Sequence, residues 1–148
     1  MRGSDIVCWE NVLRYYGDNP EVVAQYRRIM KSGKCPFCEP NITNELVVKT
    51  EYWNVVKNQF PYPNSEVHLL ILPRRHIYTP LMLPPAESEE INYAIRCAAE
   101  KIPVINDGYD LGLRVKKNGG ITLRHLHLHL IVAKVENGVF LPVRFMMG

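Results

Sequence analysis

The segment Arg124-His125-Leu126-His127-Leu128-His129-Leu130-Ile131-Val132 alternates histidine with leucine. Strict alternation predicts a β-strand, because successive side chains of a strand point to opposite faces. One face should therefore pack against a core, and the other should present imidazoles at a spacing of roughly 6.6–6.8 Å. The predicted core residues are Leu126, Leu128 and Leu130, and the predicted functional residues are His125, His127 and His129.

The three histidines are too widely spaced to bind one metal ion together. In a straight strand the first and third Cβ atoms lie roughly 13 Å apart, whereas metal–nitrogen bonds are about 2.0–2.1 Å long. At most two neighbours can share an ion, which leaves one or two imidazoles for acid–base or nucleophilic chemistry. The alternative is an exposed histidine ladder without a function. Three histidines in register argue against it, because histidine gains little over Thr or Val in a strand.

Composition indicates one domain of ordinary size, with 148 residues of which 47% are hydrophobic. No apolar run is long enough to cross a membrane, and the start Met1-Arg2-Gly3-Ser4-Asp5 lacks an apolar signal region. We therefore expect a cytoplasmic protein without a membrane partner. The net charge of +3 suits small phosphorylated substrates and is weak support for a nucleic-acid partner, which we do not expect.

Two of the four cysteines are close in sequence, in the segment Lys34-Cys35-Pro36-Phe37-Cys38. This spacing fits either a redox pair or half of a zinc site. A redox pair is expected next to a βαβ unit, and the sequence does not predict one. Cys8 and Cys97 lie in helical patterns, and we interpret them as small buried hydrophobic residues.

The remaining patterns predict two N-terminal helices, a series of strands and one long helix. The expected helices cover residues 9–16, 20–32 and 85–102, and the expected strands are two within 45–57, then 67–72, 109–116, the histidine segment and 139–145. Hairpin-connected strands around one long helix make an α+β domain with an antiparallel sheet. The N-terminal helical pair carries no chemical signal, and we interpret it as packing or dimer surface.

The histidine pattern, the loop Asn58-Gln59-Phe60-Pro61-Tyr62 and the strand end Pro73-Arg74-Arg75-His76 resemble the histidine triad (HIT) family. The resemblance extends from Cys35 to Val132. It implies a HIT-like α+β fold with an antiparallel sheet of about five strands, one long helix and additional N-terminal helices, commonly assembled as a homodimer. On this basis residues 1–34 are an N-terminal helical extension and residues 35–148 are the HIT domain.

The zinc-bearing branches of this superfamily resemble the chain in four residues: Cys35, Cys38, His76 and His125. Two thiolates and two imidazoles form the closed tetrahedral set that zinc prefers in structural sites. The resemblance therefore implies a structural Zn²⁺ that positions the start of the histidine strand. The alternative is that the two histidines only form hydrogen bonds beside the catalytic ring and the cysteines bind no metal.

The resemblance also assigns catalytic and binding roles. His127 corresponds to the nucleophile that attacks the α-phosphorus of a nucleotide, while His129 and Thr122 hold non-bridging phosphate oxygens. Asn58 is implied to contact the ribose. The backbone N–H groups of Gly119-Gly120 are positioned to stabilise charge on the transferred group, because glycine lets the backbone approach phosphate closely.

Two residues depart from this pattern or add to it. Many family members carry glutamine where this chain has Ile121, and isoleucine cannot donate a hydrogen bond to a leaving oxygen. His68 lies within an apolar strand, and we interpret it as a structural, hydrogen-bonded histidine.

The resulting hypothesis is a phosphoramidase-type or dinucleoside-polyphosphate-type HIT hydrolase or transferase acting on a small nucleotide through a nucleotidyl-histidine. The alternative is a nucleotide-binding HIT module with little or no turnover. Processing of nucleic-acid ends is a third option, which only the mild positive charge supports.

Overall fold

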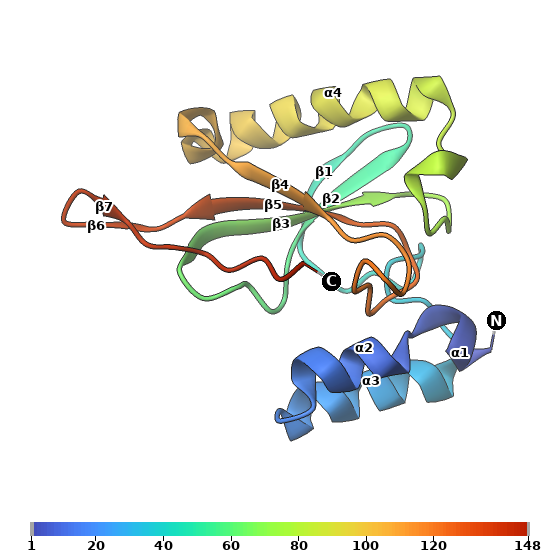
Figure 1. Ribbon diagram of the computed structural model, residues 1–148. Helices are drawn as coiled ribbons and strands as arrows, with labels where there is room; N and C mark the ends of the chain where they lie inside the picture. Colours follow the sequence, from blue (N-terminus) through green and yellow to red (C-terminus); the bar gives the residue numbers. More distant parts are fainter. Residues whose placement is uncertain (1, 148) are drawn as a thin grey trace.

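The computed structural model describes residues 2–147 and contains a five-stranded antiparallel sheet in the order β1-β2-β3-β5-β4 (Figure 1). The strands are β1 (Leu46–Lys49), β2 (Trp53–Lys57), β3 (Ser65–Pro73), β4 (Asp110–Leu113) and β5 (Leu128–Ala133). A separate hairpin joins β6 (Val135–Glu136) to β7 (Val139–Phe140). The predicted α+β class with about five strands is confirmed.

Three helices begin and end close to the predicted residues, and the short helix α1 (Gly3–Ile6) and two 3₁₀ turns were not predicted. The three are α2 (Trp9–Tyr16), α3 (Pro20–Ser32) and α4 (Pro85–Lys101), and the 3₁₀ turns are η1 (Pro80–Met82) and η2 (Pro103–Asp107). The Asn19 side chain accepts a hydrogen bond of 3.2 Å from the Val22 N–H, and Pro20 occupies the first helical turn. Gly33 ends α3 in the left-handed conformation, with φ of 64°. Among residues 2–147, no helix is long and apolar enough to cross a bilayer.

The sheet separates two apolar clusters. On one face α4 packs over β1 and β2, while α1–α3 lie on the opposite side of the sheet (Figure 1). Residues of β3 alternate between the clusters: Leu69 and Ile71 join the α4 side, whereas Leu70 and Leu72 join the side of the N-terminal helices. Trp53 is fully buried on the α4 side, and its indole N–H donates to the Glu87 carbonyl at 2.8 Å.

The histidine segment alternates as predicted, but its regular strand begins only at Leu128. The residues before Leu128 form their backbone hydrogen bonds outside the sheet. The Arg124 N–H donates to the Ile6 carbonyl and the Leu126 N–H donates to the Ile77 carbonyl, both at 2.6 Å. These contacts hold the segment in place ahead of β5, although the chain bends at Arg124 and His125. Leu126 and Leu130 are therefore both 0% exposed in the α4-side cluster, and the histidines face the other way.

Two predicted strands are shorter than expected. The strand predicted at 109–116 is regular only as β4, because Lys116 has a positive φ of 57° and the chain turns there. The strand predicted at 139–145 is regular only as β7, after which residues 141–147 run without regular structure. Phe145 of this tail packs against Gly112 of β4, where a Cβ would approach the ring to 2.5 Å. The tail thus adds side chains to the sheet rather than another strand.

Candidate active site and metal cluster

A cavity of about 660 Å³ opens on the face of the sheet away from α4. Five of the predicted site residues line it: Asn58, Gly120, Thr122, His127 and His129. Gly119 is not among the lining residues and packs against the Val115 backbone. The size is typical of a small-molecule site.

His127 is 8% exposed, and its ring is held in one orientation. Its Nδ1 lies 2.7 Å from the His125 carbonyl oxygen, which can only accept a hydrogen bond, so Nδ1 carries the proton. The other nitrogen, Nε2, then keeps its lone pair. Burial lowers the pKa of His127, and this favours the neutral ring.

His129 is oriented by a chain of hydrogen bonds from the Tyr62 backbone through His68. The Tyr62 N–H donates to His68 Nδ1 at 3.0 Å, so the His68 proton lies on Nε2. His68 Nε2 in turn lies 2.9 Å from His129 Nδ1 and donates to it. In the neutral ring His129 therefore carries its proton on Nε2. The amide nitrogen of Asn58 lies 3.2 Å from His68 Nε2 and 3.5 Å from His68 Nδ1. It therefore contacts the imidazole ring of His68 without selecting one of the two nitrogens.

His68 is hydrogen-bonded, as its predicted structural role requires, but its partner is a member of the triad. His68 and His129 lie diagonally across the paired strands β3 and β5, with His68 opposite Ile131 and His129 opposite Leu70. Sequence reasoning missed this contact because strand pairing sets it across 61 positions. His68 therefore sets the tautomer of His129.

The His68–His129 pair predicts a loss of stability in acid. Burial, followed by the nearby charge of Arg114, lowers the pKa of His68 to about 4. The unfolded chain then binds more protons than the native chain between pH 6.5 and 4, so the free energy of unfolding falls as pH falls through this window. We expect the wild-type slope to exceed that of His68→Gln by up to about 1.4 kcal/mol per pH unit. Urea unfolding of both proteins at several pH values tests this, and parallel curves would contradict it.

The N-terminal helices contribute directly to the cavity. Tyr15 and Tyr16 at the end of α2 and Tyr26 of α3 line it. The Tyr26 hydroxyl lies 2.9 Å from the Thr122 hydroxyl and shares a hydrogen bond with it. The interpretation of these helices as packing or dimer surface alone was therefore wrong. Helical spacing identifies an amphipathic face but not the object that it packs against.

The contact between Tyr26 and Thr122 can be measured by a double-mutant cycle. Tyr26→Phe removes only the hydroxyl, and we expect the free energy of unfolding to fall by about 1 kcal/mol. Thr122→Val removes the partner, and the coupling energy between the two changes should also be about 1 kcal/mol. Strictly additive effects in urea unfolding would indicate that the two hydroxyls do not bond in solution.

The loop before the triad is shaped by α2 and by a glycine. Asn11 of α2 donates through its amide to the carbonyls of Lys117 at 3.0 Å and Ile121 at 2.8 Å. Gly120 has a positive φ of 83°, and a Cβ there would collide with the Tyr15 hydroxyl. Helix α2 thus holds the loop that carries the predicted phosphate-binding backbone.

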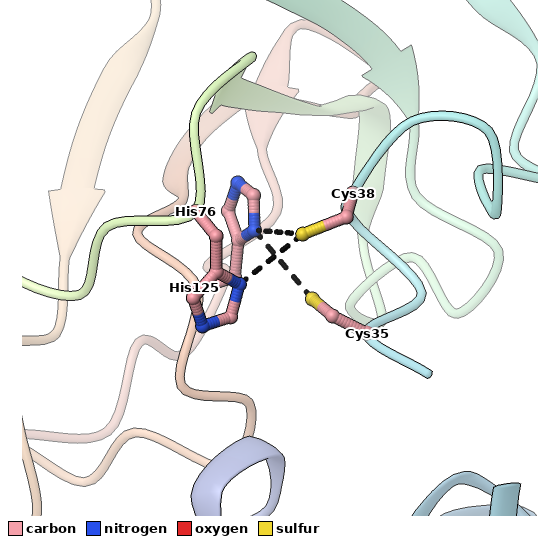
Figure 2. Close-up of side chains that lie close together, drawn as sticks. All are labelled: Cys35, Cys38, His76 and His125. Carbon is pink, nitrogen blue, oxygen red and sulfur yellow. Dashed lines mark hydrogen bonds between the residues drawn. The ribbon is translucent and has the colours of Figure 1, made fainter. Parts of the chain in front are cut away.

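The four predicted metal ligands converge, although they come from three separate segments (Figure 2). Their ligand atoms all lie within 4.8 Å of one another. Cys38 Sγ lies 3.2 Å from His76 Nδ1 and 3.5 Å from His125 Nδ1, and Cys35 Sγ lies 3.5 Å from His125 Nδ1. Tetrahedral bonds of about 2.3 Å to sulfur and 2.1 Å to nitrogen would place such atoms about 3.6 Å apart. The cluster therefore has dimensions that fit a metal ion.

The donor chemistry of this cluster also fits a cation. His125 Nε2 donates to the Pro73 carbonyl at 2.8 Å, which leaves the Nδ1 lone pair facing the thiols. Burial, followed by the neighbouring Cys35, raises the pKa of Cys38 to about 12, so the pair stays protonated unless a cation compensates the thiolate charge. Burial lowers the pKa of His125 to about 4 and keeps this ligand neutral.

A model of the HIT domain family matches residues 39–136. The chain belongs to the HIT family. The prediction made from the histidine pattern is thus confirmed.

The chain is similar to several known proteins. An uncharacterized HIT-like protein from Helicobacter pylori is 30% identical over 69 residues, which are 47% of this chain and 66% of that protein, just under two thirds. A solved structure of a Hit-like protein has a TM-score of 0.58 at 24% identity, covering 65% of this chain and 92% of that one. A solved structure of a HIT family hydrolase from Clostridium thermocellum has a TM-score of 0.54 at 26% identity. The match covers 66% of this chain and 85% of that one.

Part of the cavity wall lies outside the matched HIT segment. Helices α2 and α3 precede residue 39, and the tail after residue 136 supplies Arg144 and Met146. One further wall residue, Arg114, follows β4 within the matched segment. Sequence reasoning did not single out Arg114, because an arginine at the end of a strand has no distinguishing local pattern.

Proposed function

We propose that this protein is a nucleotidyl hydrolase or transferase that cleaves a small nucleotide at its α-phosphate through a nucleotidyl-histidine. The observation that carries the proposal is the geometry of His127. Its Nδ1–H donates to the His125 carbonyl, so the lone pair of the ring is on Nε2. The His127 side chain also lines the cavity of about 660 Å³. A neutral imidazole with a fixed tautomer is suited to attack an electrophilic phosphorus.

The reaction has two steps. First, Nε2 of His127 forms a bond to the α-phosphorus while the bond from phosphorus to the leaving group breaks, and the leaving group keeps the electron pair. Water or another acceptor hydroxyl then attacks the phosphorus, the N–P bond breaks, and its electron pair returns to Nε2 as the acceptor proton is released. The carbonyl of His125 stabilises the ring while it carries positive charge.

The surrounding groups are proposed to bind the nucleotide. His129 donates through Nε2–H, and Thr122 through its hydroxyl, to non-bridging oxygens. The Gly120 N–H adds a backbone donor, with Gly119 shaping the turn, and Asn58 contacts the ribose. Asn58 Oδ1 already accepts from the Phe60 N–H at 2.9 Å, so the amide is positioned at the cavity wall.

We further propose that the Cys35, Cys38, His76 and His125 cluster binds a structural Zn²⁺. The soft sulfur and imidazole donors and their tetrahedral spacing favour zinc. When bound, the ion supplies charge compensation for two thiolates and no open coordination position for a substrate. The role of these residues is to hold His125, whose carbonyl in turn orients His127.

The reaction can be detected by intact-protein mass spectrometry after a brief quenched incubation with adenosine phosphoramidate or diadenosine triphosphate. We expect an adenylate-sized adduct, or release of AMP, in the wild type. Nucleotide binding without adduct or AMP across these substrates would favour a binding module instead. Ile121, which is 2% exposed and offers no side-chain donor, is the feature that favours this second candidate.

We also propose that the protein forms a homodimer through the edge strand β4. Tyr109, Leu111 and Leu113 on or beside this strand are exposed large hydrophobic residues. An uncovered apolar edge strand offers unpaired backbone groups to a second copy. Light scattering should give twice the chain mass, and Leu111→Lys should shift the protein to a monomer.

A further inference from the structure

Arg114 is held in a defined position at the wall of the cavity. Its Nη1 donates to the Tyr62 hydroxyl at 2.9 Å, and its Nε donates to the Met146 carbonyl at 3.1 Å. The guanidinium carbon lies 3.9 Å from the centroid of the Phe145 ring. Because the guanidinium stacks on an aromatic face and two of its donors are engaged, the group is oriented before any ligand binds.

This arginine has no anionic partner in the part of the chain that the structure describes. No carboxylate lies within ion-pair distance of Arg114 among residues 2–147. The described residues that line the cavity include no Asp or Glu, and its cations are Arg28, Lys34, Arg114 and Arg144. A half-buried guanidinium in such a cavity favours an anionic ligand.

Two groups that donate hydrogen bonds, Arg114 Nη1 and His129 Nε2, face each other at this point. The chain from Tyr62 through His68 places the His129 proton on Nε2, and Arg114 Nη1 lies 3.5 Å from that atom. Both groups can only donate, so they do not satisfy each other. An oxygen that accepts from both groups would complete this arrangement. A phosphoryl oxygen has the charge and the lone pairs to do so.

We propose that Arg114 is a catalytic residue, and that its guanidinium and the Nε2–H of His129 together bind one non-bridging oxygen of the transferred phosphate. This inference rests on the proposed nucleotidyl transfer. It adds a charged donor for a non-bridging oxygen, in a site where the side chain of Ile121 offers no donor to the leaving oxygen. The C-terminal tail then has a function, because Phe145 and Met146 hold the guanidinium in place.

The proposed role adds no proton transfer to the reaction. As Nε2 of His127 bonds to phosphorus and the leaving group departs with its electron pair, the non-bridging oxygens gain negative charge. Arg114 and His129 donate hydrogen bonds to that charge and keep their protons. Donors that are oriented in advance stabilise a transition state more than a ground state, since they need no reorganisation.

The test compares Arg114→Met, Arg114→Lys and Arg114→Ala with the wild type. The readouts are single-turnover AMP release from whichever nucleotide forms the adduct in the wild type, and the affinity for AMP by calorimetry. We expect Arg114→Met to lose about 10²–10³-fold in rate and about 10-fold to 100-fold in AMP affinity. Arg114→Lys should be intermediate, since it keeps the charge but loses the planar fork. Arg96→Met, on the solvent-exposed side of α4, removes the same charge far from the cavity and should retain wild-type rates.

Chemical rescue separates a direct role from a structural one. Added guanidinium ion should restore part of the rate of Arg114→Ala, and it should not restore a protein that has merely lost packing. Rates and AMP affinity within threefold of the wild type, or slow variants without rescue, would overturn the role of Arg114. If the wild type itself forms neither adduct nor AMP, the proposed transfer fails. If Arg114→Met then bound AMP as tightly as the wild type, the proposed phosphate-binding role of Arg114 would be wrong as well.

Discussion

Replacement of His127 by asparagine is expected to lower the rate of nucleotidyl transfer by at least about 10⁴-fold. Asparagine keeps an N–H that can donate to the His125 carbonyl, as His127 Nδ1 does at 2.7 Å, but it has no nucleophilic lone pair at the position of Nε2. The nucleotidyl adduct should be absent from His127→Asn in the mass spectrum. AMP should still bind, because Thr122, His129 and Arg114 are unchanged.

The size of this loss distinguishes a nucleophile from a residue that only binds phosphate. Loss of one phosphate donor costs about 10²–10³-fold and leaves the reaction path intact. The thermal unfolding midpoint of His127→Asn provides the control, since it should stay near that of the wild type. An adduct that persists in the variant would show that another residue is the nucleophile.

Removal of the metal is expected to have the largest effect on stability. An ion present at 1,000 times its dissociation constant stabilises the native state by about 4.1 kcal/mol. For a chain of this length that corresponds to a fall in the unfolding midpoint of about 13 °C after chelation. Cys38→Ser should show the same fall without chelator and should contain no bound zinc by elemental analysis. Cys97→Ser, in a half-buried cysteine outside the cluster, is the matched control.

Metal removal should also slow catalysis indirectly. His125 is both a proposed ligand and the residue whose carbonyl accepts from His127, so a loose His125 leaves the nucleophile less well oriented. We expect a loss of about 10–100-fold in rate for Cys38→Ser. Two results together would contradict the zinc proposal. They are the absence of zinc from wild-type protein purified from zinc-supplemented medium, and an unfolding midpoint that chelation does not change.

The sequence by itself determined the parts of the molecule that have a local cause. Alternation of His and Leu placed the two faces of the histidine segment correctly, because the side-chain period of an extended chain is two residues. The cap formed by Asn19 and the stop formed by Gly33 located α3, since both act within one helical turn. The cysteine pair and the family resemblance together identified the four residues that converge in Figure 2.

Only the tertiary structure decided how these parts are assembled into a cavity. The contact of His68 with His129 joins residues 61 positions apart, and that of Tyr26 with Thr122 joins residues 96 positions apart. The stacking of Arg114 on Phe145 depends in the same way on the path of a tail without regular structure. Such contacts leave no periodic or local signal, because they arise from strand pairing and from which apolar face a helix buries. For this reason the sequence identified the triad, whereas the groups that orient it and the proposed arginine became visible only in the folded chain.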